Sequence, residues 1–188
     1  MRRSGAGPGD RVLVTGAGPI GLLTVAVLRA EGVDDVTVSE PAPLRRQRAL
    51  DVGATAVVVP GDLVAPASPT KVVAQPFQAA IECSGRADAI VGALGQLDRQ
   101  GVLVLSGTGM ERPQLDHLRV ILSELVVTGS LEYTREDFSD ALDLLASGRL
   151  PLEQLVESND VPLSAVADAM LRLASGELAG KVLVVPHA

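Results

Sequence analysis

The sequence has few of the residues that form disulfides and bind metals. It contains one cysteine, Cys83, and two histidines, His117 and His187, in 188 residues. A single cysteine excludes an intrachain disulfide and gives no sign of an oxidising compartment, so we expect a cytoplasmic protein. The three residues lie far apart in the sequence, and a zinc site needs several such ligands to converge. We therefore expect no metal site in this chain.

Basic residues and long apolar runs are also scarce. The chain has 16 lysines and arginines against 23 acidic residues, a net charge of −7, which would repel nucleic acid and anionic membranes. No apolar run reaches the roughly 18 residues that span a bilayer, and no apolar segment follows the arginines at the N-terminus. We expect no nucleic acid and no membrane as partner, which leaves a small molecule as the default ligand.

What the sequence does have is enough apolar material for a core, at 47% of its residues. Six short runs rich in β-branched residues predict strands that are covered on both faces, because they alternate little with polar residues. Segments with helical periodicity separate them, and this alternation favours a doubly wound α/β sheet. The predicted strands cover residues 11–15, 35–40, 55–59, 78–83, 102–106 and 125–129, and the predicted helices begin near residues 20, 43, 86 and 115.

Two segments depart from this pattern. Residues 60–77 contain four prolines, so we expect a loop with at most a turn or two of helix. After residue 129 the pattern changes to two amphipathic helices, over 134–147 and 164–175, and a final apolar run. At the start of the first of these helices, Thr134 and Asp137 have the spacing of a capping box. We therefore predict a domain over residues 9–130 and a tail over residues 131–188.

Three glycines lie between the first predicted strand and the first predicted helix. Gly16, Gly18 and Gly21 form the sequence GAGPIG, the dinucleotide-binding fingerprint in the context that gives it physical meaning. The first glycine permits a tight turn, the second lets a pyrophosphate approach the backbone, and the third lets the helix pack closely on the strand. The plain alternative is an ordinary strand-to-helix turn.

An acidic residue at the end of the second strand strengthens the dinucleotide interpretation. Glu40 lies 19 residues after Gly21, where a carboxylate would bind the adenosine ribose hydroxyls. It would also repel a 2′-phosphate, so we expect NAD rather than NADP. Arg45, Arg46 and Arg48 on the next helix either offset that repulsion in part or are solvated helix charges, which we expect for at least two of them.

Several stretches together resemble one family. GDRVLVTGAGPIGLL, DVGAT, IECSG and GVLVLSGTG are similar to the cofactor-binding half of the zinc-dependent medium-chain dehydrogenases, nearest to the sorbitol, butanediol and threonine dehydrogenase branch. The resemblance runs from Gly9 to Pro186. It implies a six-stranded Rossmann sheet and a tail that folds back on a catalytic domain. It also implies that a zinc-binding catalytic domain, which precedes this part in the family, is missing here.

The resemblance also assigns site residues. The glycine segment would wrap the pyrophosphate, Glu40 and Arg45 would lie at the adenosine ribose, and the turn after the fourth strand would pass the cofactor's ribose region. The segment after the fifth strand would bind the carboxamide, and a basic residue in the tail would lie near the pyrophosphate. The implied cofactor-binding residues are Gly16, Gly18, Pro19, Ile20, Gly21, Glu40, Arg45, Cys83, Ser84, Ser106, Gly107, Thr108 and Lys181.

The resemblance implies that the complete enzyme oxidises a secondary alcohol or polyol, with zinc activating the alcohol and NAD accepting the hydride. We expect this chain alone to bind NAD(H) and to turn over no alcohol. A non-catalytic NAD-sensing or oligomerising module is the alternative, and a methyltransferase is disfavoured by the third glycine and the six-strand pattern. We also expect a homo-oligomer, because the sixth strand would be an exposed apolar sheet edge.

Overall fold

The computed structural model describes residues 2–186, so His187 lies outside the described residues. A parallel sheet of six strands forms its centre, in the order β3-β2-β1-β4-β5-β6. The doubly wound sheet predicted from the sequence is confirmed. Five of its strands begin within one residue of the predicted position, whereas β5 begins earlier, because an irregularity in its pairing with β4 adds residues before Val102. The strands are β1 (Arg11–Thr15), β2 (Asp35–Ser39), β3 (Ala56–Val58), β4 (Phe77–Glu82), β5 (Leu97–Leu105) and β6 (Val126–Gly129).

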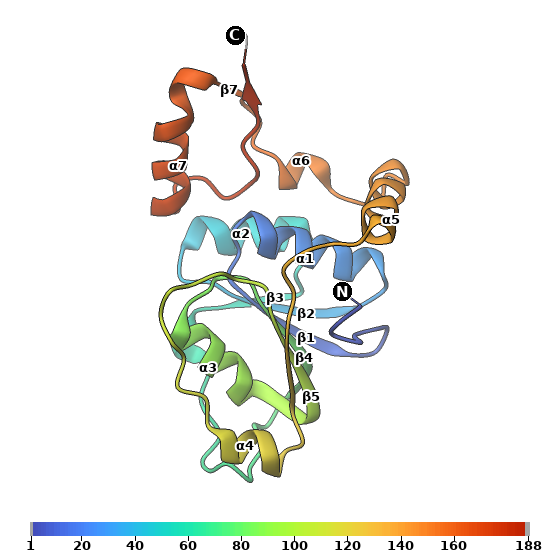
Figure 1. Ribbon diagram of the computed structural model, residues 1–188, viewed down its shortest axis with the longest axis vertical. Helices are drawn as coiled ribbons and strands as arrows, with labels where there is room; N and C mark the ends of the chain where they lie inside the picture. Colours follow the sequence, from blue (N-terminus) through green and yellow to red (C-terminus); the bar gives the residue numbers. More distant parts are fainter. Residues whose placement is uncertain (1, 187–188) are drawn as a thin grey trace.

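Helices cover both faces of the sheet (Figure 1). Helices α1 (Pro19–Ala30) and α2 (Pro43–Val52) lie on one face, and α3 (Ala87–Gln96) lies on the other. Successive side chains of a strand point to opposite faces, so Val12 and Val14 of β1 enter the core beneath α1, and Leu13 enters the core beneath α3. A fourth helix, α4 (His117–Leu122), leads into the edge strand β6.

The buried face of α1 differs from the predicted one. The apolar periodicity of the sequence predicts one helical face made of Ile20, Leu23, Thr24, Val27 and Leu28. Of these, Leu28 is buried as expected, whereas Ile20 is 54% exposed and Leu23 is 38% exposed. Leu22 and Val25 are buried instead. The reason is the close approach at Gly21, which turns its own side of the helix toward the sheet.

The proline-rich segment forms the predicted loop, with a single 3-10 turn at Pro60–Asp62. Side chains of α3 and α4 donate hydrogen bonds to this loop. The Gln96 amide donates to the Val64 carbonyl at 2.9 Å, and Arg119 donates to the Lys71 carbonyl at 2.7 Å. The loop is therefore fixed by hydrogen bonds to its carbonyl oxygens rather than by helical structure.

The tail contains α5 (Arg135–Ala146), α6 (Leu152–Leu155) and α7 (Val166–Ser175), and a short pairing of β7 (Val161–Pro162) with β8 (Val184–Val185). The capping box of Thr134 and Asp137 is confirmed. Helix α6 was not predicted, because four residues are too few to show a period. Leu150, Leu155 and Ala179 of this segment join the core beside α1 and α2, so the segment packs against the helices on that face of the sheet. Within residues 2–186, no helix is long and apolar enough to cross a bilayer.

Candidate functional site

A cavity of about 740 Å³ opens beyond the carboxyl ends of β1, β2 and β4. It lies where β1 and β4 are neighbours, the point at which the strand order changes direction. Doubly wound sheets bind ligands at this switch point. Residues of four loops line the cavity, among them Thr15, Gly16, Gly18, Glu40, Arg45, Pro60, Leu63, Cys83, Ser84, Arg86 and Asp88.

The three glycines of the first loop differ in what surrounds them. Gly16 has φ +89°, which glycine adopts readily, and a Cβ there would lie 3.0 Å from the Ser84 Cβ. A Cβ on Gly21 would lie 1.9 Å from the Gly16 carbonyl oxygen, so only glycine allows this contact between helix and turn. A Cβ on Gly18 would meet nothing within 4 Å. The tight turn and the close packing are as predicted, and the space beside Gly18 is open.

The start of α1 faces the same opening. Gly18 is its N-cap and no side chain caps the helix. The first N–H groups of a helix lack partners within the helix and attract anions, helped by the helix dipole. The cavity therefore presents the uncapped start of α1 beside an unobstructed glycine.

Glu40 is 4% exposed and connects the glycine loop with the start of α2. One carboxylate oxygen accepts the Ala17 N–H at 2.8 Å and the other accepts the Ala42 N–H at 2.9 Å. A carboxylate has about four acceptor positions, so two bonds leave it able to accept ligand hydroxyl groups. Because Glu40 lines the cavity, these free acceptor positions are available to a ligand there.

The three arginines of α2 all donate to backbone carbonyls. Arg45 donates to the carbonyls of Leu173 and Leu178 in the tail. Arg46 donates to the carbonyls of Glu40 and Pro41. The guanidinium of Arg48 binds the Gln154 carbonyl at 3.2 Å and lies 3.5 Å from the Glu157 carboxylate. The expectation that at least two are solvated charges is therefore wrong, because the tail and the turn before α2 supply acceptors that no local pattern reveals.

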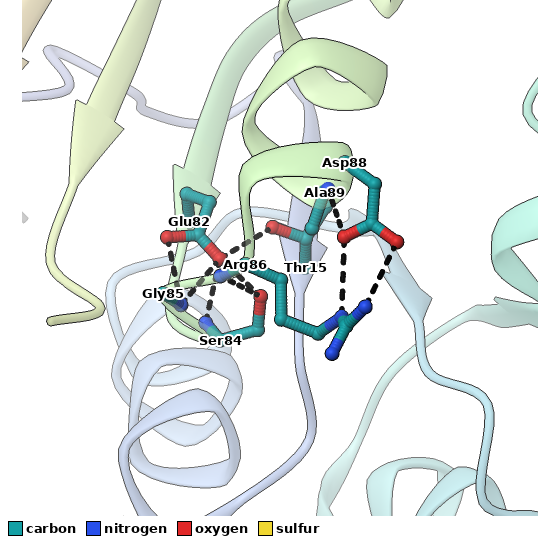
Figure 2. A network of polar contacts seen from close by, with 7 residues as sticks. All are labelled: Thr15, Glu82, Ser84, Gly85, Arg86, Asp88 and Ala89. Carbon is teal, nitrogen blue, oxygen red and sulfur yellow. Dashed lines mark hydrogen bonds and ion pairs between the residues drawn. The ribbon is translucent and has the colours of Figure 1, made fainter. Parts of the chain in front are cut away.

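A fully buried carboxylate supports the loop after β4 (Figure 2). One oxygen of Glu82 accepts the N–H of Ser84 at 2.6 Å and the N–H of Gly85 at 3.0 Å. It also accepts the Ser84 hydroxyl, and the Thr15 hydroxyl at 3.5 Å. At the cavity mouth the exposed Arg86 binds both oxygens of Asp88, which raises the pKa of Arg86 and lowers that of Asp88. Glu82 is not among the residues predicted from the sequence; the available signal is an acidic residue at the end of an otherwise apolar strand.

Cys83 lines the cavity as a neutral thiol. Burial raises its pKa to about 11, despite the Thr24 hydroxyl 3.7 Å from the sulfur, which favours the thiolate. At neutral pH a thiol with this pKa is a weak nucleophile and a weak metal ligand. Within residues 2–186, no three His, Cys, Asp or Glu side chains gather in a way that could hold a metal ion.

The remaining predicted residues do not line the cavity; they are Pro19, Ile20, Ser106, Gly107, Thr108 and Lys181. Pro19 and Ile20 form the start of α1. Ser106 and Gly107 follow β5 and donate their N–H groups to the Glu82 carbonyl at 2.8 and 2.9 Å, with Thr108 next in the chain. Lys181 lies in the tail, where its backbone pairs with Val156, and its exposed side chain does not line the cavity.

The sequence is similar to those of known dehydrogenases. Residues 19–147 match the family described as zinc-binding dehydrogenase. L-threonine 3-dehydrogenase of Streptomyces coelicolor is 33% identical over 79% of this chain and 44% of its own length.

Solved structures agree with this match. The structure of 2R,3R-butanediol dehydrogenase from Bacillus subtilis has a TM-score of 0.84 and 25% identity, over 99% of this chain and 53% of that one. A zinc-binding dehydrogenase from Sinorhizobium meliloti 1021, solved with NADP bound, has a TM-score of 0.80 and 30% identity, over 97% of this chain and 54% of that one. This chain thus spans about half the length of the relatives that it matches. From these matches and the cavity geometry, the chain belongs to the zinc-binding dehydrogenase family.

Proposed function

We propose that this chain is the NAD(H)-binding portion of a zinc-dependent alcohol or polyol dehydrogenase. The observation that carries the proposal is the open space beside Gly18, next to the uncapped start of α1 and within a cavity that Glu40 also lines. A pyrophosphate needs close approach to backbone N–H groups, and a ribose needs hydroxyl acceptors. The cavity provides both. The NAD-sensing alternative is not favoured, because the relatives are named as dehydrogenases.

The residues fit the two halves of a dinucleotide. The helix start would hold the pyrophosphate, Glu40 would accept the adenosine ribose hydroxyls, and the loop at Pro60 would lie on the adenine side. Ile20 is 54% exposed beside the pyrophosphate position and would pack against the nicotinamide. Bound NAD supplies the carbon that accepts the hydride. Within residues 2–186 no three His, Cys, Asp or Glu side chains gather as zinc ligands would, and we assign no step on a metal to these residues.

We also propose that the chain prefers NADH to NADPH. A 2′-phosphate would meet the Glu40 carboxylate, and the arginines of α2 already donate to carbonyl oxygens. The Sinorhizobium relative was solved with NADP bound, so the test of this proposal compares the two cofactors directly.

Calorimetric titration with NADH and, in parallel, NADPH tests both proposals, and suits a chain with no tryptophan. We expect NADH to bind and NADPH to bind at least tenfold more weakly. Equal affinities would contradict the role of Glu40 in cofactor choice. Binding of neither dinucleotide would contradict the proposed function.

The exposed edge of the sheet supports a homo-oligomer. Strand β6 is an edge strand, and Val126 is 50% exposed. Helix α4, which precedes β6, exposes Ile121 at 64% and Leu118 at 49%. Unpaired apolar edges tend to be covered. We expect a dimer by light scattering at tens of micromolar, and Val126→Lys should shift it toward monomer. A cytoplasmic location remains a prediction from the cysteine content.

A further inference from the structure

Glu82 lies beneath the cavity and takes no part in the cofactor contacts proposed above. Its side chain is 0% exposed, yet its partners are neutral donors rather than a cationic side chain. A buried carboxylate requires hydrogen bonds to offset its lost hydration. Here the donors come from two segments, since Thr15 is the last residue of β1, directly before the glycine turn, and Ser84 and Gly85 follow β4.

The backbone of the same residue holds a third loop. The Glu82 carbonyl accepts the N–H groups of Ser106 and Gly107, which follow β5. The third loop also packs directly on the second. A Cβ on Gly107 would lie 2.1 Å from the Gly85 nitrogen, and one on Gly109 would lie 1.7 Å from the Gly85 carbonyl oxygen. A shift of Gly85 would therefore displace the Ser106–Gly109 segment.

We propose that Glu82 is a positioning residue that sets where the loop at Ser106 lies relative to the glycine turn, and hence where the nicotinamide end of the dinucleotide is held. The proposal rests on the proposed function for the identity of the ligand. A carboxylate only accepts hydrogen bonds, whereas an amide presents an NH₂ group to one side. One oxygen of Glu82 accepts all four donors, and the other accepts, among the described residues, only the Gly85 N–H, at 3.1 Å. Glu82→Gln removes the negative charge that strengthens these bonds and places an NH₂ group against either the Gly85 N–H or the four donors, which would force the β4 loop to move.

The first test needs no ligand. Amide hydrogen exchange of the full chain is measured by NMR in wild type, Glu82→Gln and the control Glu124→Gln, which removes an exposed carboxylate that accepts from Gln100. We expect the amides of Gly85, Ser106 and Gly107 to exchange at least tenfold faster in Glu82→Gln, while those of β1 keep their protection. Loop protection within twofold of wild type would overturn the proposal, and so would an equal loss of protection throughout the sheet.

The second test separates the two ends of the ligand. AMP carries the adenosine part that Glu40 would bind, and NADH adds the nicotinamide end. We expect Glu82→Gln to weaken NADH binding at least tenfold and to leave AMP binding within twofold, and Glu82→Asp, which retains the carboxylate, to recover part of the NADH affinity. Equal weakening of both ligands would overturn the proposal. If wild type binds no NADH, the proposed function fails, and the exchange measurement still decides whether Glu82 positions the loops.

Discussion

Alanine substitutions at Gly18 and Gly21 are expected to separate cofactor binding from stability. The two glycines are three residues apart in the sequence, but an added Cβ atom would clash with the protein at Gly21 and would meet open space at Gly18. A methyl group on Gly21 would lie 1.9 Å from the Gly16 carbonyl oxygen, well inside the 3.0 Å that real Cβ atoms keep. A methyl group on Gly18 would meet no protein atom within 4 Å, and the Gly18 φ of −73° suits alanine.

The magnitudes follow from these contacts. Gly21→Ala forces α1 away from the turn, a strain of about 3 kcal/mol. The better helix propensity of alanine offsets about 1 kcal/mol of this. The net loss of about 2 kcal/mol should lower Tm by roughly 4–8 °C in a chain of this size. Gly18→Ala should change the free energy of unfolding by less than about 0.5 kcal/mol. Its methyl group fills the space proposed for the pyrophosphate and should weaken NADH binding at least tenfold, or about 1.4 kcal/mol.

Thermal melts followed by far-ultraviolet circular dichroism measure the first effect, and calorimetric NADH titration measures the second. Gly7→Ala is the matched control, because a Cβ there also meets nothing within 4 Å and Gly7 does not line the cavity. Wild-type NADH affinity in Gly18→Ala would refute the placement of the pyrophosphate. A wild-type Tm in Gly21→Ala would refute the close contact of helix and turn.

Three further predictions concern the thiol of Cys83, the guanidinium of Arg119 and the capping box of α5. The pKa of Cys83 is raised from 9.0 to about 11, so the folded state keeps the thiol proton to a higher pH than the unfolded state does. The free energy of unfolding should therefore fall as the pH rises from 9.0 toward 11. In thermal melts over this pH range, Cys83→Ala should abolish the part of the loss that comes from this thiol. Arg119 is 3% exposed and donates to four carbonyls, so Arg119→Met should cost about 3 kcal/mol in urea unfolding, against less than about 1 kcal/mol for the exposed Arg99→Met. Thr134→Ala removes the capping box of α5 and should lower the free energy of unfolding by about 1 kcal/mol; an unchanged Tm would show that α5 does not depend on its cap.

The sequence predicted those features that depend on neighbouring residues. The predicted start of α2 near residue 43 is confirmed, because Pro43 occupies the first helical position, where its missing N–H costs nothing. The capping box of α5 needs only residues three apart. The glycine turn was recognisable because its strand, turn and helix follow each other directly in the chain.

The tertiary structure decided the features whose partners lie far away in the sequence. Arg45 finds its carbonyl acceptors about 130 residues later, at Leu173 and Leu178, and Thr15 meets Glu82 across 67 residues. The exposed position of Ile20 depends on the packing of α1 against the sheet at Gly21. Composition and periodicity thus determined the α/β sheet and the location of its glycine loop. The distant partners of the buried carboxylates, Ala17 for Glu40 and Thr15 for Glu82, followed only from folding, because they depend on which segments the sheet brings together at its carboxyl edge.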